Sequence, residues 1–118
     1  MITEFRRLIF SKDEILKAIL SYNLRSSVKL PPGDITNIKT TSVPEPAIVL
    51  DVHDPSSDTT ETVTLESTYL AATMLRYCME FKIPIPRHAD KYVEIVGDGV
   101  ALSMSINANA KKLLEIQI

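Results

Sequence analysis

The order of predicted strands, helix and connector in the first half of this chain repeats in the second half. The two halves align when Ile15 is placed over Leu70. Each half carries a strand pattern, an amphipathic helix pattern, a connector that contains proline, and two more strand patterns joined by a turn. The other positions that coincide are Ile19 with Met74, Leu20 with Leu75, Tyr22 with Tyr77, Leu30 with Ile85, and Pro31 with Pro86. The repeat predicts two βαββ units, at about residues 1–54 and 60–108. Identities are few, so the alternative is that two amphipathic helices followed by hairpins simply look alike.

The first helix pattern has clear limits. Ser11 and Glu14 match a capping box, in which a serine hydroxyl and a glutamate carboxylate satisfy backbone donors at the start of a helix. The apolar periodicity then runs to Leu24 or Arg25. Residues 30–33 contain two prolines and a glycine, which cannot continue a helix. A helix is therefore expected from about Ser11 to Arg25.

The second helix pattern covers about residues 66–82 and stops at a segment in which isoleucine and proline alternate, residues 83–86. Strands are expected at residues 35–41, 47–52, 60–65, 92–96 and 100–106. Gly97-Asp98-Gly99 predicts a tight hairpin between the last two strands, because Asp-Gly tolerates positive φ. Residues 111–118 fit either a short helix or an edge strand.

These patterns predict one α+β domain in which the two halves form a single antiparallel or mixed sheet, with both helices packed on one face. Composition agrees with one folded core, since 45% of the 118 residues are hydrophobic and 24% are charged. Such a pseudo-twofold arrangement predicts a groove along its axis. The matched tyrosines Tyr22 and Tyr77 are the candidate groove residues.

Charge and cysteine content exclude several classes of protein. The net charge of -2 gives no general attraction to nucleic acid or to an anionic membrane. No apolar run approaches the roughly 18 residues of a membrane span, and the first ten residues do not resemble a signal peptide. The single cysteine, Cys78, excludes an internal disulfide framework and is expected to be a small buried hydrophobe. A cytoplasmic location is the expectation.

Basic side chains gather around the end of the second helix and the connector after it: Arg76, Lys82, Arg87, His88 and Lys91. Four of them, Arg76, Arg87, His88 and Lys91, are the candidate site for a protein partner or an anion. The alternative is a solvated rim whose charge is compensated by the acidic residues of the same region, Glu80, Asp90 and Glu94. Nucleic acid is an unlikely partner, because the chain has no aromatic base-stacking motif and no recognition helix rich in Arg and Asn.

Neither histidine lies in a recognisable metal or catalytic pattern. His53 is flanked by Asp51 and Asp54, and His88 precedes Asp90, but strand alternation places Asp51 on the surface, so no metal is expected. The chain has no nucleophile elbow and no phosphate-binding glycine loop. No catalytic residue and no cofactor are predicted.

Residues 10–14, 30–33 and 83–87, with Lys91 following, resemble phrases shared by short uncharacterised proteins of alphaproteobacteria. The resemblance covers most of the chain. It implies a bacterial cytosolic protein and carries no assigned activity.

The hypothesis that follows is a non-enzymatic protein-binding or adaptor module, which acts through the second helix and its basic connector, alone or as a homodimer. One alternative is a sensor of a small molecule or anion that uses the groove between the halves. Another is a weak binder of nucleic acid through the local basic patch. A third is a small enzyme in which His88 or His53 is the general acid or base.

Overall fold

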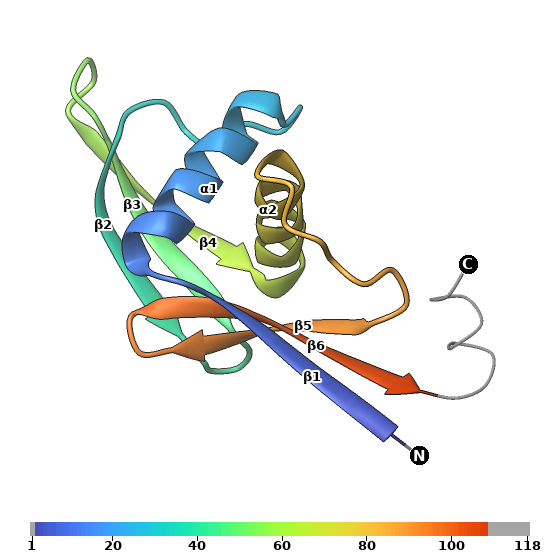
Figure 1. The fold of residues 1–118 in the computed structure, drawn as a ribbon. Helices are drawn as coiled ribbons and strands as arrows, with labels where there is room; N and C mark the ends of the chain where they lie inside the picture. The colour runs from blue at the N-terminus through green and yellow to red at the C-terminus, as the bar shows by residue number, and fades with distance from the viewer. Residues whose placement is uncertain (1, 109–118) are drawn as a thin grey trace.

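A computed structural model describes residues 2–108, and this part of the chain has two helices and six strands (Figure 1). The elements are β1 (Ile2–Phe10), α1 (Lys12–Arg25), β2 (Asp34–Thr41), β3 (Ala47–Asp54), β4 (Thr59–Glu66), α2 (Ser67–Glu80), β5 (Asp90–Val96) and β6 (Gly99–Ala108). The predicted α+β class is confirmed. The element predicted at residues 111–118 lies outside the described residues.

The strands form two three-stranded sheets, so the prediction of a single sheet is wrong. Sheet A has the order β1-β6-β5 and sheet B the order β2-β3-β4, and all pairings are antiparallel. The Thr40 hydroxyl donates to the Gly97 carbonyl oxygen at 3.4 Å, which links β2 to the β5–β6 turn by a side chain. Because strands twist relative to one another, two small sheets can cover different sides of a helix pair where one flat sheet could cover only one.

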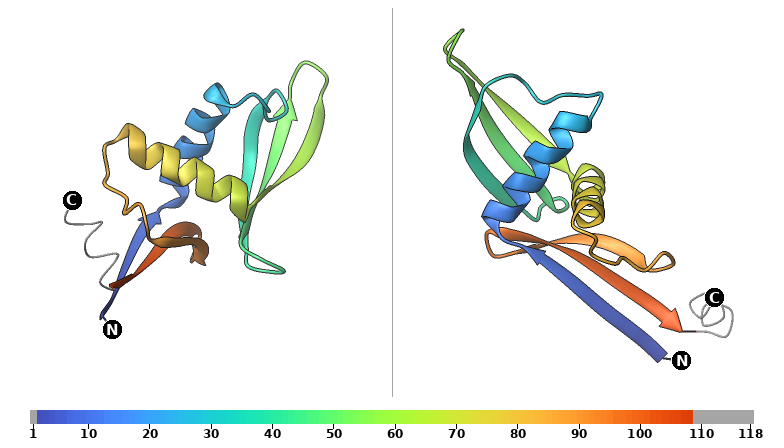
Figure 2. Two further views of the ribbon diagram at one scale, coloured as in Figure 1. Left: turned by 90° about the vertical axis from the view of Figure 1, so that its right-hand side faces the viewer. Right: turned by 45° about the horizontal axis from the view of Figure 1, so that its top comes forward.

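The two helices lie in the angle between the sheets (Figures 1 and 2). One cluster of buried side chains joins the helices to both sheets. Its fully buried members include Ile15 and Ile19 of α1, Leu70 and Met74 of α2, Ile48 and Leu50 of β3, and Val100 and Leu102 of β6. Each such side chain contributes on the order of 1.5–3 kcal/mol when it leaves water. The halves therefore bury their apolar surface against each other.

Each sheet also combines strands from both halves of the chain. β1 pairs with β6, from Ile2 opposite Ala108 to Phe10 opposite Val100. β4 pairs with β3 in the same antiparallel sense. The first strand of each half thus lies beside the last strand of the other half. The helices keep the spacing seen in the sequence, since α1 and α2 have the same length and their ends coincide in the alignment of the two halves.

The start of α1 confirms one part of the capping prediction and corrects the other. The backbone N–H of Glu14 donates to Ser11 Oγ at 3.2 Å, as in a capping box. The Glu14 carboxylate does not turn back to the cap; its Oε2 accepts the hydroxyl of Tyr77 at 2.9 Å. Glu14 therefore connects α1 to α2.

The β5–β6 hairpin forms where it was predicted, with a different assignment of its turn residues. Val96 pairs with Gly99, which leaves Gly97 and Asp98 as a two-residue loop. Gly97 has a φ of 60°, and a glycine with positive φ at the first central position is the mark of a type II′ turn. Gly99 has another role: a Cβ there would lie 2.5 Å from the Phe10 carbonyl oxygen. Its lack of a side chain lets β6 approach the end of β1.

Candidate partner-binding site

The end of α2 reverses the chain and brings the following connector back toward the helix. Lys82 has a φ of 55°, and its N–H donates to the Met79 carbonyl at 3.2 Å. The N–H of Ile83 donates to the Cys78 carbonyl at 2.8 Å. These two bonds form a Schellman motif, which satisfies carbonyls at the end of a helix and turns the chain sharply. Pro84 then prevents any return to helix.

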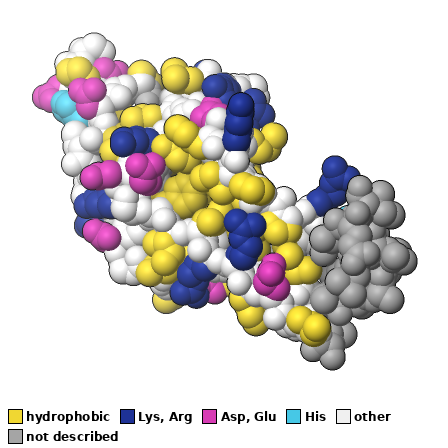
Figure 3. Space-filling view, viewed as in Figure 1, with side chains coloured by type: hydrophobic (Ala, Val, Ile, Leu, Met, Phe, Trp, Pro, Cys, Tyr) yellow, Lys and Arg dark blue, Asp and Glu magenta, His cyan; other side chains and the backbone are white. Residues whose placement is uncertain are grey.

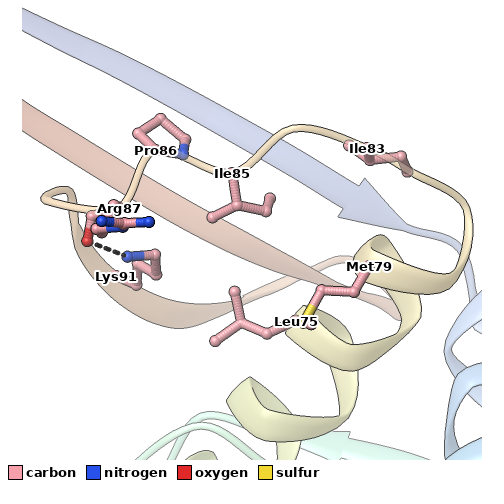
Figure 4. A pocket seen from close by; sticks show the side chains of 7 residues that line it. All are labelled: Leu75, Met79, Ile83, Ile85, Pro86, Arg87 and Lys91. Atoms are coloured by element: carbon pink, nitrogen blue, oxygen red, sulfur yellow. Dashed lines mark hydrogen bonds between the residues drawn. The ribbon is translucent and has the colours of Figure 1, made fainter. Parts of the chain in front are cut away.

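This reversal encloses a hollow of about 320 Å³, here called the α2 hollow, between α2 and the connector (Figure 4). Its lining residues are Leu75, Met79, Ile83, Ile85, Pro86, Arg87 and Lys91. Five of these seven side chains are apolar. Met79 is 69% exposed, and it contributes to an apolar patch together with the neighbouring lining residues. The floor of the hollow is therefore apolar surface that the described residues leave open to solvent.

Two cations stand at the rim of this apolar floor. Lys91 Nζ donates to the Ala89 carbonyl at 3.0 Å and to the Arg87 carbonyl at 3.5 Å, and the second of these bonds is drawn in Figure 4. Two loop carbonyls thus fix the ammonium group beside the hollow. Arg87 is exposed at the same rim.

The acidic residues expected to compensate this charge are mostly engaged elsewhere. Glu80 forms an ion pair with Arg25, and its two carboxylate oxygens accept the Ser21 hydroxyl at 3.1 and 3.3 Å. Glu94 is paired with Arg7. Within residues 2–108, neither Arg87 nor Lys91 forms an ion pair. Their charge therefore remains available to a carboxylate from outside.

The structure brings together two of the four basic residues proposed from the sequence. Arg87 and Lys91 line the α2 hollow, whereas Arg76 and His88 do not. Arg76 is exposed on α2, one turn before Met79 and Glu80, and His88 is exposed in the connector. Arg76 and His88 therefore border the region and do not form part of the lining.

Sequence reasoning missed most of the apolar lining. Ile83 and Ile85 entered the analysis only as part of a segment that ends a helix, yet they face the same hollow as Leu75 and Met79 (Figure 4). The available signal was the regular alternation of isoleucine with proline, because a residue before proline favours extended backbone, in which residues two apart lie on the same side. Hydrophobic side chains gather around α2 on this face of the molecule, with Lys and Arg side chains among them (Figure 3).

The two tyrosines proposed for a groove lie at the contact between the helices, each against another aromatic ring. Tyr22 packs edge-on against Tyr69, with ring centroids 5.2 Å apart. Tyr77 contacts Phe10 and Phe81 at 5.8 and 4.7 Å. Neither tyrosine lines the α2 hollow. Burial, then the hydrogen bond from its hydroxyl to Glu14, raises the pKa of Tyr77.

Cys78 is buried in the core, as predicted. Burial raises the pKa of its thiol, against a smaller opposite influence from Arg6. A buried thiol that stays protonated is a poor nucleophile. Cys78 therefore acts as a packing residue.

Neither histidine is among the residues that line the α2 hollow. His53 Nδ1 is 3.1 Å from the Thr60 hydroxyl, and its Nε2 is 3.5 Å from Asp58 Oδ1 at the exposed β3–β4 turn. Asp51 accepts a hydrogen bond from Thr62 at 2.9 Å on the solvent side of β3, where alternation placed it. Among residues 2–108, no group of three or more His, Cys, Asp or Glu side chains is arranged to hold a metal ion.

Comparison with known proteins gives no match from which a family or a function could be assigned. No protein-family model, no curated protein and no solved structure matches the chain. Within the described residues, neither helix is long and apolar enough to cross a membrane.

Proposed function

We propose that this chain is a non-enzymatic binding module whose α2 hollow takes a short segment of a partner protein. The observation that supports this proposal is the pairing of open apolar surface with uncompensated positive charge. Met79 exposes most of its side chain beside Arg87 and Lys91, which have no ion-pair partner within residues 2–108. A segment that carries an apolar side chain next to Asp or Glu satisfies both features.

The size of the hollow sets the expected affinity. Its 320 Å³ lies near the lower end of the roughly 300–1,000 Å³ range of ligand pockets. One or two apolar side chains contribute on the order of 1.5–3 kcal/mol each, and a partly exposed carboxylate pair adds about 1 kcal/mol or less. Association also costs translational and rotational freedom. The Kd of an isolated peptide is therefore expected to be weaker than about 10 µM.

The test is selection from a library of short peptides on the full chain, followed by binding titrations with wild type and three variants. Wild type and a control with Lys12→Glu and Lys39→Glu are expected to bind the selected peptides equally. Arg87→Glu with Lys91→Glu has the same change in net charge and is expected to weaken binding at least about tenfold. Met79→Asp is expected to weaken binding similarly. The new aspartate would replace an apolar contact and would lose water when the peptide, which carries its own carboxylate, covers the hollow.

Two results would contradict the proposal. Peptides that lack both apolar and acidic residues, or binding unchanged by the rim and Met79 variants, would remove the α2 hollow as the site. Thermal stabilisation by small carboxylates or phosphates, with no peptide selected, would assign the rim to anion sensing.

We also propose that the two βαββ halves descend from one duplicated unit. The exchange of first strands between the sheets supports this, because swapping the halves converts the order β1-β6-β5 into β4-β3-β2. Helix contacts agree: Tyr77 bonds to Glu14, and the matched positions in the opposite halves, Tyr22 and Tyr69, form the other contact across the helices. Sequences of relatives with more similar halves would test this proposal, and halves that become less alike in them would contradict it.

A further inference from the structure

β1 forms an outer edge of sheet A, and its backbone is ready to accept another strand. All nine residues of β1 pair with β6 in one continuous register, without a bulge or a proline. Within residues 2–108, no strand pairs with its other side. Figures 1 and 2 show that the N-terminal half of β1 extends beyond the helices. Natural edge strands are usually blocked by charge, proline, bulges or short length, since an open edge can pair with another chain.

The apolar side chains that β1 presents to solvent are not required by the fold. β4 holds the matching edge position in sheet B, and it coincides with β1 in the alignment of the two halves. Two inward positions agree in character, Leu8 with Val63 and Phe10 with Leu65. The outward positions do not: Phe5 and Ile9, which are 70% and 59% exposed, correspond to Thr60 and Thr64. β4 completes its sheet with hydroxyl side chains, so the exposed Phe5 and Ile9 need another explanation.

We propose that β1 pairs antiparallel with β1 of a second copy of this chain, with the two-fold axis at Phe5. An axis perpendicular to the paired strands places one residue opposite its own copy. With Phe5 at the axis, the two phenyl rings face each other, and aromatic cross-strand pairs stabilise sheets. Glu4 then lies opposite the second copy's Arg6, and Ile2, which is 76% exposed, lies opposite the second copy's Leu8. Every pair is apolar with apolar or acid with base, apart from Thr3 with Arg7.

The neighbouring registers fail on charge. An axis at Arg6 would set two guanidinium groups against each other, and an axis at Glu4 would do the same with two carboxylates; like charges directly opposite destabilise a sheet. The Phe5 register also uses the charged side chains of β1 that form no ion pair among the described residues. Arg7 is already paired with Glu94 inside the chain. Within residues 2–108, the Glu4 side chain has no hydrogen bond or ion pair, and the only hydrogen bond of the Arg6 side chain runs from Nη1 to the Pro84 carbonyl at 3.1 Å.

The test is the mass of the full chain in solution, measured by sedimentation velocity over a range of concentrations. Wild type is expected to reach twice the 13.2 kDa of one chain. Glu4→Arg alone and Arg6→Glu alone each place like charges opposite each other twice, so each is expected to weaken dimerisation by about tenfold or more. A mixture of the two variants restores both acid–base pairs in a heterodimer and is expected to recover the dimer.

The control variant is Glu61→Arg, which alters the charge at the matching position of β4 and is expected to leave the dimer unchanged. Phe5→Thr introduces the residue that β4 carries at the same place and is expected to yield monomer with unchanged circular dichroism. A wild-type monomer at about 0.1 mM would overturn the proposal, as would a dimer that resists both charge variants. A dimer lost in both variants but not recovered on mixing would overturn the Phe5 register.

This inference does not depend on the α2 hollow, because none of its lining residues lies on β1. Peptide binding and self-association can therefore fail separately.

Discussion

Sheet A and sheet B share one plan and differ in what they show to solvent. Each has a central strand from one half and an edge strand from the other. The inward positions near the end of each edge strand are apolar in both sheets, Leu8 and Phe10 on β1 and Val63 and Leu65 on β4. Two outward positions of β1, Phe5 and Ile9, are apolar, whereas the matching positions of β4 are Thr60 and Thr64. Packing thus restricts the inward face, whereas the outward face is free to acquire a role in one half alone.

The largest expected effect comes from separating the halves. Each sheet needs a strand from the other half, and the buried cluster draws on both helices. Residues 1–55 and 56–118, produced separately, are each expected to lack a cooperative unfolding transition, because neither can bury enough apolar surface to offset its conformational entropy. Mixing them is expected to restore the circular dichroism and thermal transition of the intact chain. A cooperative transition in either half alone would show that the halves are independent.

Core truncation in the two central strands is the next largest test. Leu50 of β3 and Leu102 of β6 are both fully buried in the same cluster. Leu50→Ala and Leu102→Ala are each expected to lower the free energy of unfolding by about 2–5 kcal/mol, because each leaves a cavity in a close-packed interior. Urea denaturation measures both. A loss below about 1 kcal/mol in only one variant would show that one sheet packs loosely and that the core is not shared equally.

A smaller contrast lies in the two tyrosine contacts between the helices. The Tyr77 hydroxyl donates to Glu14, whereas the buried Tyr69 hydroxyl has no hydrogen-bond partner within residues 2–108. Tyr77→Phe is expected to lower the free energy of unfolding by about 1 kcal/mol, and Tyr69→Phe to raise it by about 1 kcal/mol, since an unsatisfied buried hydroxyl costs stability. Urea denaturation of the two variants measures both changes. Equal losses in both variants would mean that Tyr69 has a partner.

Local features of this fold were predictable and nonlocal ones were not. The limits of α1 follow from the Ser11 cap and the apolar periodicity, which are properties of a few neighbouring residues. The pairing of β1 with β6 joins opposite ends of the described chain, and strand periodicity tells which face is buried without telling which strand lies alongside. The single-sheet prediction failed for this reason.

The candidate site also has a part that the sequence predicts and a part that it does not. Arg87 and Lys91 were found because they lie close together in the sequence. The apolar floor depends on a chain reversal in which Lys82 adopts positive φ, a conformation that lysine rarely takes and that no sequence signal marks. Helix periodicity alone therefore could not place Met79 beside Ile83 and Ile85 in one hollow.

The smallest expected effect is the pH dependence of stability that Tyr69 and Tyr77 cause. Burial, first, and then the neighbouring Tyr22 raise the pKa of Tyr69 above its ordinary value of 10.0, and burial with Glu14 does the same for Tyr77. The folded state therefore holds these protons more tightly than the unfolded state. Stability from this source is complete below pH 10 and falls as pH rises further, because the unfolded chain releases its protons first. In urea denaturation between about pH 9 and pH 11, Tyr69→Phe is expected to flatten the decline, and Tyr69→Phe with Tyr77→Phe to flatten it more. A decline that stays as steep in the double variant would place its origin outside the contact between the helices.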